Sequence, residues 1–293
     1  MESDLDLPET WRQAADVVQT EGGVALILGN TSSGKTTLLK YLGERLSHQN
    51  QPIAVVDADI GQSTIGPPAT ICGVVFKSLL HPIETMIPQE MFFVGSTSPA
   101  GHLVQALVGV KRLVEWAVST GSRSILVDTT GMVRGNEALL LKFYEIEILQ
   151  PRHLLVLQQQ GELESVISPF AQRKSLQVYR LPISSLAKKR NQEERKSYRA
   201  KKFQDYFKRA SMKLLSTRGL TFLNQTSGIL PRYLLVGLND TDHRTLGLGI
   251  VEAFDAQSHE IFIYTPLRDL TLVRSMTLGT LRIDLNGREL EKG

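Results

Sequence analysis

Short apolar runs alternate with amphipathic stretches through the first two-thirds of the chain. The runs cover residues 24–28, 53–59, 91–95, 124–130, 153–157 and 175–181. Apolar residues at helical spacing lie between some of them, over residues 37–46, 103–118 and 137–149. Short strands that are apolar on both sides and separated by helices indicate a parallel sheet with both faces covered. The pattern therefore predicts an α/β fold with a doubly wound parallel sheet.

The pattern changes near residue 220. The remaining chain has strand-like runs with no helix between them, and Gly, Pro, Asn and Asp separate these runs, which cover residues 233–238, 248–254, 260–264 and 280–284. We therefore expect two units, a first one over residues 1–219 and a small C-terminal β domain over residues 220–293. Ligands of parallel α/β sheets bind at the carboxyl ends of the strands, so candidate site residues should directly follow the apolar runs.

The first candidate site follows the run 24–28 and precedes a predicted helix. It matches the phosphate-binding P-loop pattern G-x-x-x-x-G-K-[ST] through Gly29, Asn30, Thr31, Ser32, Ser33, Gly34, Lys35 and Thr36, with Thr37 next in the chain. We expect the loop N–H groups and the helix N-terminus to point at an anion. Lys35 would then contact the β- and γ-phosphates, and the Thr36 hydroxyl would ligate Mg²⁺.

Two carboxylates follow the second run, in the sequence Asp57-Ala58-Asp59-Ile60-Gly61-Gln62. Because they are two residues apart at a strand end, they point in opposite directions, one toward a nucleotide and the other toward the scaffold or a second ligand. Phosphoryl transfer needs a metal near the β- and γ-oxygens and a base for the acceptor's proton, and an Asp opposite Lys35 can serve either need. The alternative interpretation is an Asp–Gly turn that ends a strand.

A third candidate is Asp128, which follows the apolar residues 125–127 and precedes Thr130 and Gly131 in a predicted loop. A carboxylate at this place in a P-loop fold holds Mg²⁺, directly or through water. An ordinary strand end capped by Asp and Thr is the alternative. The loop over residues 95–102 also opens a helix, and its hydroxyls would either hold a substrate phosphate or only cap that helix.

The segment from Lys188 to Lys213 carries eleven Lys and Arg residues against three acids, a local net charge of +8. Its apolar residues make one stripe at helical spacing: Phe203, Tyr206, Phe207, Ala210 and Leu214. Arg195 and Arg199, four residues apart, share another face, and the planar guanidinium suits two phosphate oxygens at once. We interpret these two arginines as phosphate ligands and the lysines as solvated surface.

The composition narrows the classes of function. The net charge is only +3, and the single cysteine, Cys72, allows no internal disulfide and is expected in the core. The six histidines show no metal-ligand spacing, so no zinc site is expected. The N-terminus lacks a signal-peptide pattern and no apolar stretch approaches the ~20 residues that span a bilayer, so we expect a cytoplasmic protein with no membrane contact.

The order of these elements, a P-loop, then D-x-D-x-G-Q, then T-x-G, then an Arg-rich stretch ending in Tyr-Phe, resembles the polynucleotide 5′-hydroxyl kinase family. Members of that family include the kinase of the mRNA cleavage machinery and the nucleolar kinase of ribosomal RNA processing. The resemblance covers roughly residues 20–210, and the D-x-D-x-G-Q element beside a P-loop is its most specific part. Residues 1–219 would then form a P-loop kinase domain whose lid helix covers about 188–213.

The resemblance implies transfer of the γ-phosphate of ATP to the 5′-hydroxyl of RNA, possibly also of DNA. Lys35 and Thr36 would hold ATP and Mg²⁺, and an Asp of D-x-D-x-G-Q would be the general base, with Asp59 favoured over Asp57. The arginines Arg195 and Arg199 would be those of the family's mobile lid, which stabilise charge on the transferring phosphoryl group. The remaining implied ligands are Asp57 and Asp128 for the metal and Gln62, Thr130 and Gly131 for the substrate.

Two departures from the family pattern stand out. The family's T-x-G-W has a tryptophan after the glycine, whereas Met132 follows Gly131 here, which puts that residue's contribution to RNA binding in doubt. The eukaryotic members also carry an N-terminal β domain that helps cover the nucleotide, whereas here the first run begins near residue 24. Trp11 is the one aromatic residue in this N-terminal segment, and we expect it to anchor the core rather than cover an adenine.

Three other functions compete with the kinase. A P-loop GTPase or metallochaperone-like switch also carries D-x-D, but the run 153–157 ends in Gln158-Gln159-Gln160-Gly161 without the N/T-K-x-D element that reads guanine. A non-catalytic scaffold would bind ATP only to stabilise an RNA-processing complex. A small-molecule kinase would use the same lid arginines, although the +8 segment favours a polyanionic acceptor.

Overall fold

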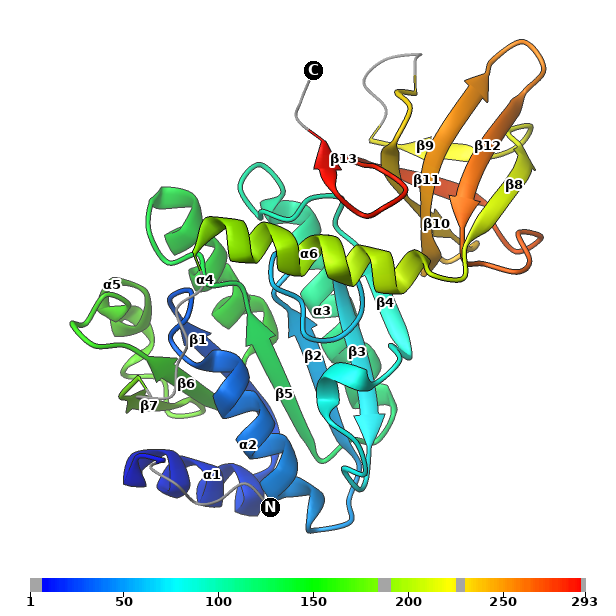
Figure 1. Ribbon diagram of the computed structural model, residues 1–293. Coiled ribbons are helices and arrows are strands. Elements are labelled where there is room, and N and C mark those ends of the chain that lie inside the picture. Colours follow the sequence, from blue (N-terminus) through cyan, green and yellow to red (C-terminus); the bar gives the residue numbers. More distant parts are fainter. Residues whose placement is uncertain (1–6, 184–190, 225–229, 291–293) are drawn as a thin grey trace.

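The computed structural model describes residues 7–183, 191–224 and 230–290, which form two units, each built around one sheet (Figure 1). The sheet of the first unit has the order β4-β3-β2-β5-β1-β6-β7. Its strands are β1 (Gly23–Gly29), β2 (Ile53–Ala58), β3 (Thr70–Phe76), β4 (Glu90–Phe93), β5 (Ser124–Thr129), β6 (His153–Leu157) and β7 (Gln177–Leu181). From β2 to β7 all neighbours are parallel, as the alternation of runs and helices predicts.

Strand β3 is absent from the sequence-based prediction, and it makes one edge of the sheet antiparallel. It pairs antiparallel with both β2 and β4. The reason is the length of the connection, because residues 59–69 are fewer than the dozen or more that a parallel crossover needs. The fold class is confirmed, and the sheet is parallel in its centre with an antiparallel edge.

Helices cover both faces of this sheet. They are α1 (Glu9–Glu21), α2 (Lys35–Ser47), α3 (Leu103–Ser119), α4 (Asn136–Leu149) and α5 (Glu164–Ile167), with two short 3₁₀ turns, η1 (Ile83–Thr85) and η2 (Ser168–Phe170). Alternate residues of β1 serve the two faces: Ile27 packs with Leu38 of α2 and Trp11 of α1, whereas Leu28 belongs to the core cluster that includes residues of α3 and α4. Burial of both faces by helices is the doubly wound arrangement.

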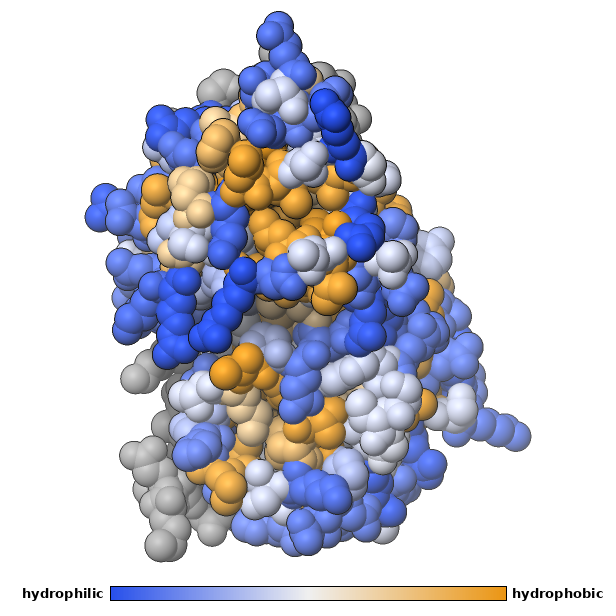
Figure 2. All heavy atoms as spheres, turned by 90° about the vertical axis from the view of Figure 1, so that its right-hand side faces the viewer, coloured by the Kyte–Doolittle hydropathy of each residue, from blue (hydrophilic) through white to orange (hydrophobic). Residues whose placement is uncertain are grey.

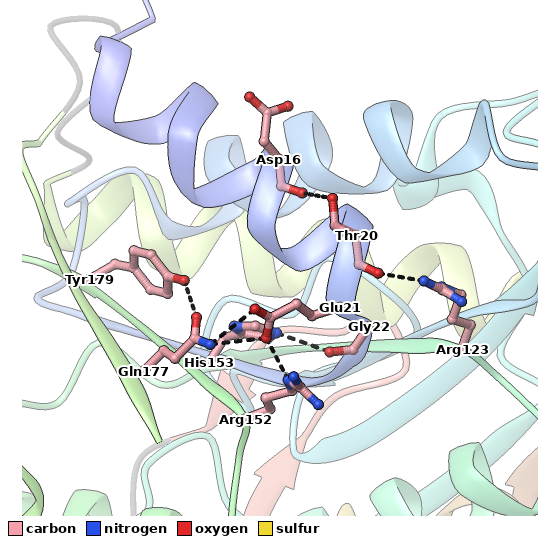
Figure 3. Close-up of polar contacts among 9 residues, drawn as sticks. All are labelled: Asp16, Thr20, Glu21, Gly22, Arg123, Arg152, His153, Gln177 and Tyr179. Carbon is pink, nitrogen blue, oxygen red and sulfur yellow. Dashed lines mark hydrogen bonds and ion pairs between the residues drawn. The ribbon is translucent and has the colours of Figure 1, made fainter. Parts of the chain in front are cut away.

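The C-terminal end of helix α1 is attached to the sheet near the amino ends of β6 and β7 (Figure 3). The carboxylate of Glu21 accepts hydrogen bonds from Arg152 Nε at 2.7 Å and Gln177 Nε2 at 2.9 Å. Nε2 of the buried His153 lies 2.9 Å from the carbonyl oxygen of Gly22. At the other end of this helix the fully buried Trp11 donates Nε1–H to the carbonyl oxygen of Pro182, which confirms its role in the core.

The second unit is a largely antiparallel sheet of order β14-β13-β10-β11-β12-β8, with β9 paired to β13. Its strands are β8 (Ser211–Ser216), β9 (Thr221–Leu223), β10 (Leu234–Asn239), β11 (Thr245–Asp255), β12 (Glu260–Thr265), β13 (Ser275–Ile283) and β14 (Glu289–Leu290). Apolar side chains gather on the face of this unit seen in Figure 2, and Met212, Leu214 and Phe262 of β8 and β12 are exposed.

The helix predicted over residues 188–213 is shorter in the structure. Residues 184–190 lie outside the described part of the chain, and helix α6 runs from Gln192 to Phe207. Leu214 is not part of its apolar stripe, because residues 211–216 form strand β8, in which Leu214 lies opposite Phe262 of β12. We therefore propose that the boundary between the two units lies near residue 210 rather than 219.

Helix α6 and contacts that include two backbone hydrogen bonds from strands join the units. The backbone N–H of Phe93 in β4 donates to Thr245 Oγ1 at 3.0 Å, and that of Thr280 donates to the carbonyl oxygen of Gly95 at 2.9 Å. Phe203 and Phe207 of α6 pack in a core cluster that contains residues of both sheets. In the described part of the chain, no helix is both long and apolar enough to cross a membrane.

Candidate active site

The P-loop connects β1 to α2 and contains two residues in the left-handed region. Ser32 has φ 62° and Gly34 has φ 95°, so a glycine at position 34 avoids the strain that a larger residue meets there. A Cβ atom on Gly29 would lie 2.4 Å from Ser33 Oγ, so this position also requires glycine. The loop turns tightly into the first turn of α2, where backbone N–H groups without helical partners can bind phosphate oxygens.

Lys35 lies inside this loop. Its side chain is buried, and Nζ is 3.0 Å from the carbonyl oxygens of both Gly29 and Asn30. Burial lowers the pKa of Lys35, while the carboxylates of Asp128 and Asp59 oppose that shift. A buried ammonium group held by two carbonyls provides a fixed positive charge beside the loop's N–H groups.

Asp128 is the penultimate residue of β5, beside the P-loop strand, where its Cα pairs with that of Ile27. Its Oδ2 accepts a hydrogen bond from Thr36 Oγ1 at 3.2 Å, while its Oδ1 is buried without a hydrogen-bond partner among the described residues. Burial raises the pKa of Asp128 to about 6, and the nearby Lys35 opposes this shift. A free carboxylate oxygen beside a hydroxyl is a donor set that suits Mg²⁺.

Asp57 and Asp59 separate at the end of β2, as their spacing predicts. Asp57 is buried, and its Oδ2 accepts hydrogen bonds from the backbone N–H groups of Thr64 at 2.6 Å and Ile65 at 2.7 Å. Its Oδ1 accepts from the N–H of Asp59 at 3.0 Å. Burial and the charge of Asp128 raise the pKa of Asp57 to about 7, against the effect of these donors. Asp57 therefore organises the loop over residues 59–65, called here the acidic loop.

Asp59 is half-buried and faces a large cleft. Its Oδ1 accepts hydrogen bonds from the N–H groups of Gly61 at 3.1 Å and Gln62 at 3.0 Å. The side chains of Asp59 and Gln62 both line the cleft, as do Lys35 and Thr36. A Cβ atom on Gly61 would lie 2.8 Å from the carbonyl oxygen of Thr97, so the acidic loop approaches the loop after β4 too closely for a larger residue. The fold thus places the carboxylate of Asp59 and the P-loop in the same cleft.

The cleft has a volume of about 1650 Å³. Most of its lining comes from four segments, the P-loop and α2, the acidic loop, the connection from β3 to β4, and α6, and Met91 of β4 and Leu246 of β11 complete it. Helix α6 crosses above the carboxyl ends of the strands toward the second unit (Figure 1). Strand carboxyl ends are where parallel α/β sheets bind ligands.

Helix α6 begins with a capping box. Asn191 Oδ1 accepts from the N–H of Glu194 at 2.8 Å, and Glu194 Oε2 accepts from the N–H of Asn191 at 2.7 Å. Arg195, in the first turn, lines the cleft, and its Nε is buried without a hydrogen-bond partner among the described residues. Arg199 is turned toward the C-terminal unit instead, where its guanidinium binds both oxygens of Glu289. Although the two arginines are four residues apart on one helix, only Arg195 lines the cleft.

Two further α6 residues hold the acidic loop. The hydroxyl of Tyr198 donates to the carbonyl oxygen of Ser63 at 2.9 Å, and Lys202 Nζ donates to that of Thr64 at 2.5 Å. Burial lowers the pKa of Lys202, and the carboxylate of Asp57 opposes that shift. The interpretation of the lysines as solvated surface is therefore wrong for Lys202. Sequence reasoning also missed Tyr198, because nothing in the local pattern marks a hydrogen bond to residue 63.

Thr130 and Gly131 are buried beside the P-loop. The carbonyl oxygen of Gly131 accepts from the N–H of Thr31 at 3.1 Å and from its hydroxyl at 3.2 Å. A Cβ atom on Gly131 would lie 2.5 Å from Thr31 Oγ1. These contacts hold the P-loop in place, and they explain the glycine at position 131 without a substrate.

A comparison with protein families shows which family contains this site. The model for the P-loop of the mRNA cleavage and polyadenylation factor CLP1 matches residues 29–209, which run from the first glycine of the P-loop to the end of α6. The chain belongs to this CLP1 P-loop family. The match confirms the resemblance seen in the sequence, and it covers every segment that lines the cleft except Leu246.

Curated relatives of this CLP1-family chain are similar over most of their length. A polyribonucleotide 5′-hydroxyl-kinase of Methanocaldococcus jannaschii is 29% identical, and the alignment covers 90% of this chain and 88% of the relative. One from Pyrococcus furiosus is 28% identical, with 90% and 89% covered. In structure, the chain is similar to one from a wild-type Clp1p–Pcf11p complex, with a TM-score of 0.72 over 93% of this chain and 78% of that one at 14% identity. That similarity concerns the fold.

Proposed function

We propose that this protein is an ATP-dependent kinase that phosphorylates the 5′-hydroxyl of RNA. The observation that carries the proposal is the position of Asp59, an accessible carboxylate on the wall of the same cleft as the P-loop residues Lys35 and Thr36. The archaeal relatives support it, because they are named polyribonucleotide 5′-hydroxyl kinases and align over nearly the whole chain.

The P-loop residues supply the binding of the nucleotide. Backbone N–H groups in the first turn of α2 hold the β- and γ-phosphates, and the buried charge of Lys35 neutralises them. Thr36 and the unpaired Oδ1 of Asp128 suit Mg²⁺, which when bound neutralises charge on the β- and γ-oxygens.

The acceptor side of the reaction depends on Asp59. We propose that its carboxylate takes the proton of the RNA 5′-hydroxyl as that oxygen forms a bond to the γ-phosphorus. The bond from the γ-phosphorus to the bridging oxygen breaks, and ADP leaves with that electron pair. Arg195, whose guanidinium lies at the cleft, stabilises the charge on the transferring group.

The roles of Asp57, Arg199, Thr130 and Gly131 follow from their contacts. Asp57 is occupied by backbone N–H groups, so we propose that it positions Asp59 rather than binding metal. Arg199 is paired with Glu289, Gly131 braces the P-loop, and Thr130 is buried next to Gly131, so we propose structural roles for these three.

The names of the archaeal relatives also separate the alternatives. They specify a kinase and a polyribonucleotide, which favours RNA over DNA and over a small-molecule acceptor, and they favour a kinase over a GTPase switch or a scaffold.

The test is transfer of label from ATP carrying a labelled γ-phosphate. We expect 5′-hydroxyl RNA hexamers to become labelled, DNA hexamers to be labelled less, and Lys35→Ala to reduce labelling to background. The matched control is an RNA hexamer that already carries a 5′-phosphate, which should accept no label. Label released only as inorganic phosphate, with every oligonucleotide unlabelled, would contradict the proposal and favour a switch or scaffold.

A further inference from the structure

The cleft extends well beyond the P-loop and Asp59. The part of the cleft called here the distal arm is lined by Lys40 of α2, residues 86–88 of the connection from β3 to β4, residues 198–206 of α6 and Leu246 of β11. Clefts that hold one small ligand measure roughly 300–1,000 Å³. The whole cleft measures about 1650 Å³, so it has room for a second ligand beside the nucleotide.

The distal arm is long and follows the axis of α6. Residues 198–206 of α6 line the arm, which at 1.5 Å per residue is roughly 12 Å. That length is several times the ~3.4 Å axial spacing of nucleotides in a stacked strand. Asp59 and the residues of the arm line one cleft, which also includes Leu246 of the second unit, so a strand whose 5′ end reaches Asp59 would continue along the arm.

One wall of the arm is an exposed apolar surface. Ile87 is 85% exposed, and Met86 and Pro88 on either side of it also line the cleft. The opposite wall carries the aromatic rings of Tyr198 and Tyr206. Apolar and aromatic side chains along a groove bind single-stranded nucleic acid by contact with the faces of the bases, which is tolerant of sequence.

Cations line the same arm. Lys201 and Lys202 lie on the α6 wall and Lys40 on the α2 wall. Two of these are in exposed ion pairs, Lys201 with Asp205 at 3.2 Å and Lys40 with Glu84 at 2.6 Å. Exposed ion pairs contribute little free energy, so a phosphate can compete with the carboxylates for both ammonium groups. Bases and phosphates therefore both find complementary side chains in the arm.

We propose that the distal arm binds the nucleotides that follow the reacting 5′ end of a single-stranded RNA. The apolar residues 86–88 contact the bases, and Lys40 of α2 and Lys201 of α6 contact the phosphates. The proposal rests on the proposed kinase function, because that function places the RNA 5′ end at Asp59. It makes the enzyme selective for acceptors of several nucleotides over a single nucleotide.

The first test varies the length of the acceptor. We expect KM for 5′-hydroxyl RNA to fall from a nucleoside 3′-monophosphate to a hexamer, and Ile87→Ser to raise the KM of the hexamer about fivefold through lost base contact. Leu80→Ser is the matched control, because Leu80 is 80% exposed on the same connection but does not line the cleft. A KM that is independent of length, or equal effects of the two variants, would overturn the distal arm while leaving the kinase function standing.

The second test uses salt. For Lys201→Gln we expect the slope of log affinity against log salt concentration for a fluorescent RNA hexamer to shrink by about 0.7, the value for one phosphate contact on a single strand. Lys196→Gln is the control, since Lys196 is exposed on α6 but lies outside the cleft lining. A merely structural role of Lys201 would leave the slope unchanged, and that result would overturn the phosphate contact.

Binding measured by fluorescence anisotropy separates the two proposals. If no RNA accepts label, the kinase function fails, and the distal arm is then judged by hexamer binding alone. Weaker binding by Ile87→Ser than by Leu80→Ser would support the arm without catalysis, and equal binding would overturn it.

Discussion

Side chains that are close in sequence have different surroundings at this site. Asp57 is buried and receives backbone N–H groups, whereas Asp59, two residues later, lines the cleft. Arg195 and Arg199 differ in the same way, since only the former lies at the cleft. Sequence motifs identify such pairs, but the partner of Arg199 is Glu289, ninety residues away. Nothing near residue 199 in the sequence predicts that ion pair.

Arg195→Ala should lower kcat by roughly a hundredfold or more while changing the KM for ATP little, because the guanidinium acts on charge that develops during transfer. Arg199→Ala is the matched control, and its main effect should be a lower melting temperature through loss of the ion pair with Glu289. Steady-state kinetics and thermal unfolding of both variants check this. A rise in KM alone for Arg195→Ala would indicate ground-state binding instead.

His153 should make stability depend on pH. Burial lowers its pKa in the folded protein, against the effects of the Gly22 carbonyl and Glu21. The unfolded chain therefore takes up a proton first as the pH falls below about 6.5, which favours unfolding. We expect the melting temperature to fall less between pH 7 and pH 5.5 in His153→Gln than in the wild type.

The Gln variant keeps a donor for the Gly22 carbonyl and removes only the titration. Melting temperatures by scanning calorimetry across this pH range provide the measurement. If the melting temperatures of the two proteins fell equally with pH, His153 would not contribute to the pH dependence of stability.

At the scale of elements, α6 connects the acidic loop to the second unit. Tyr198 and Lys202 donate hydrogen bonds to the carbonyl oxygens of Ser63 and Thr64. Phe203 and Phe207 pack at the junction of the two units. The apolar stripe predicts this helix, but not its end at Phe207, because Leu214 satisfies both the helical period and the alternation of strand β8. The local periodicity alone therefore does not distinguish a helix from a strand at Leu214. The pairing of β8 with β12 determines that this residue lies in a strand.

Tyr198→Phe should loosen the acidic loop without unfolding the protein. Loss of one hydrogen bond of about 1 kcal/mol predicts a decrease in kcat of roughly fivefold and faster hydrogen exchange at the amides of residues 61–65. Tyr144→Phe, at an exposed position on α4, is the control. Unchanged exchange in Tyr198→Phe would show that α6 does not hold this loop.

At the scale of the molecule, two sheets share a tightly packed junction. A Cβ atom on Gly237 of β10 would lie 2.7–2.8 Å from atoms of Phe93 in β4. The apolar runs predict every strand of the parallel centre and strands β10 to β13 of the second sheet, but not β8, β9 or β14. They do not predict β3, whose place depends on a short connection, or the junction, which arises from contacts between residues 93 and 245.

Gly237→Val should therefore force Phe93 to move, at a cost of about 1–3 kcal/mol in the free energy of unfolding. We expect a melting temperature lower by several degrees, as scanning calorimetry would record. Ala253→Val, at an exposed position on the neighbouring strand β11, should leave it almost unchanged. A similar response of both variants would indicate that the two units do not pack as described.

The central claim is that Asp59 directs the γ-phosphate onto the 5′ oxygen of RNA. The most direct measurement labels a 5′-hydroxyl RNA with γ-labelled ATP, digests it to nucleotides and locates the label. We predict that all label is on the nucleoside 5′-monophosphate from the first position, and that Asp59→Asn lowers the yield by about a hundredfold or more. Label at any other position, or an undiminished yield from Asp59→Asn, would contradict the account.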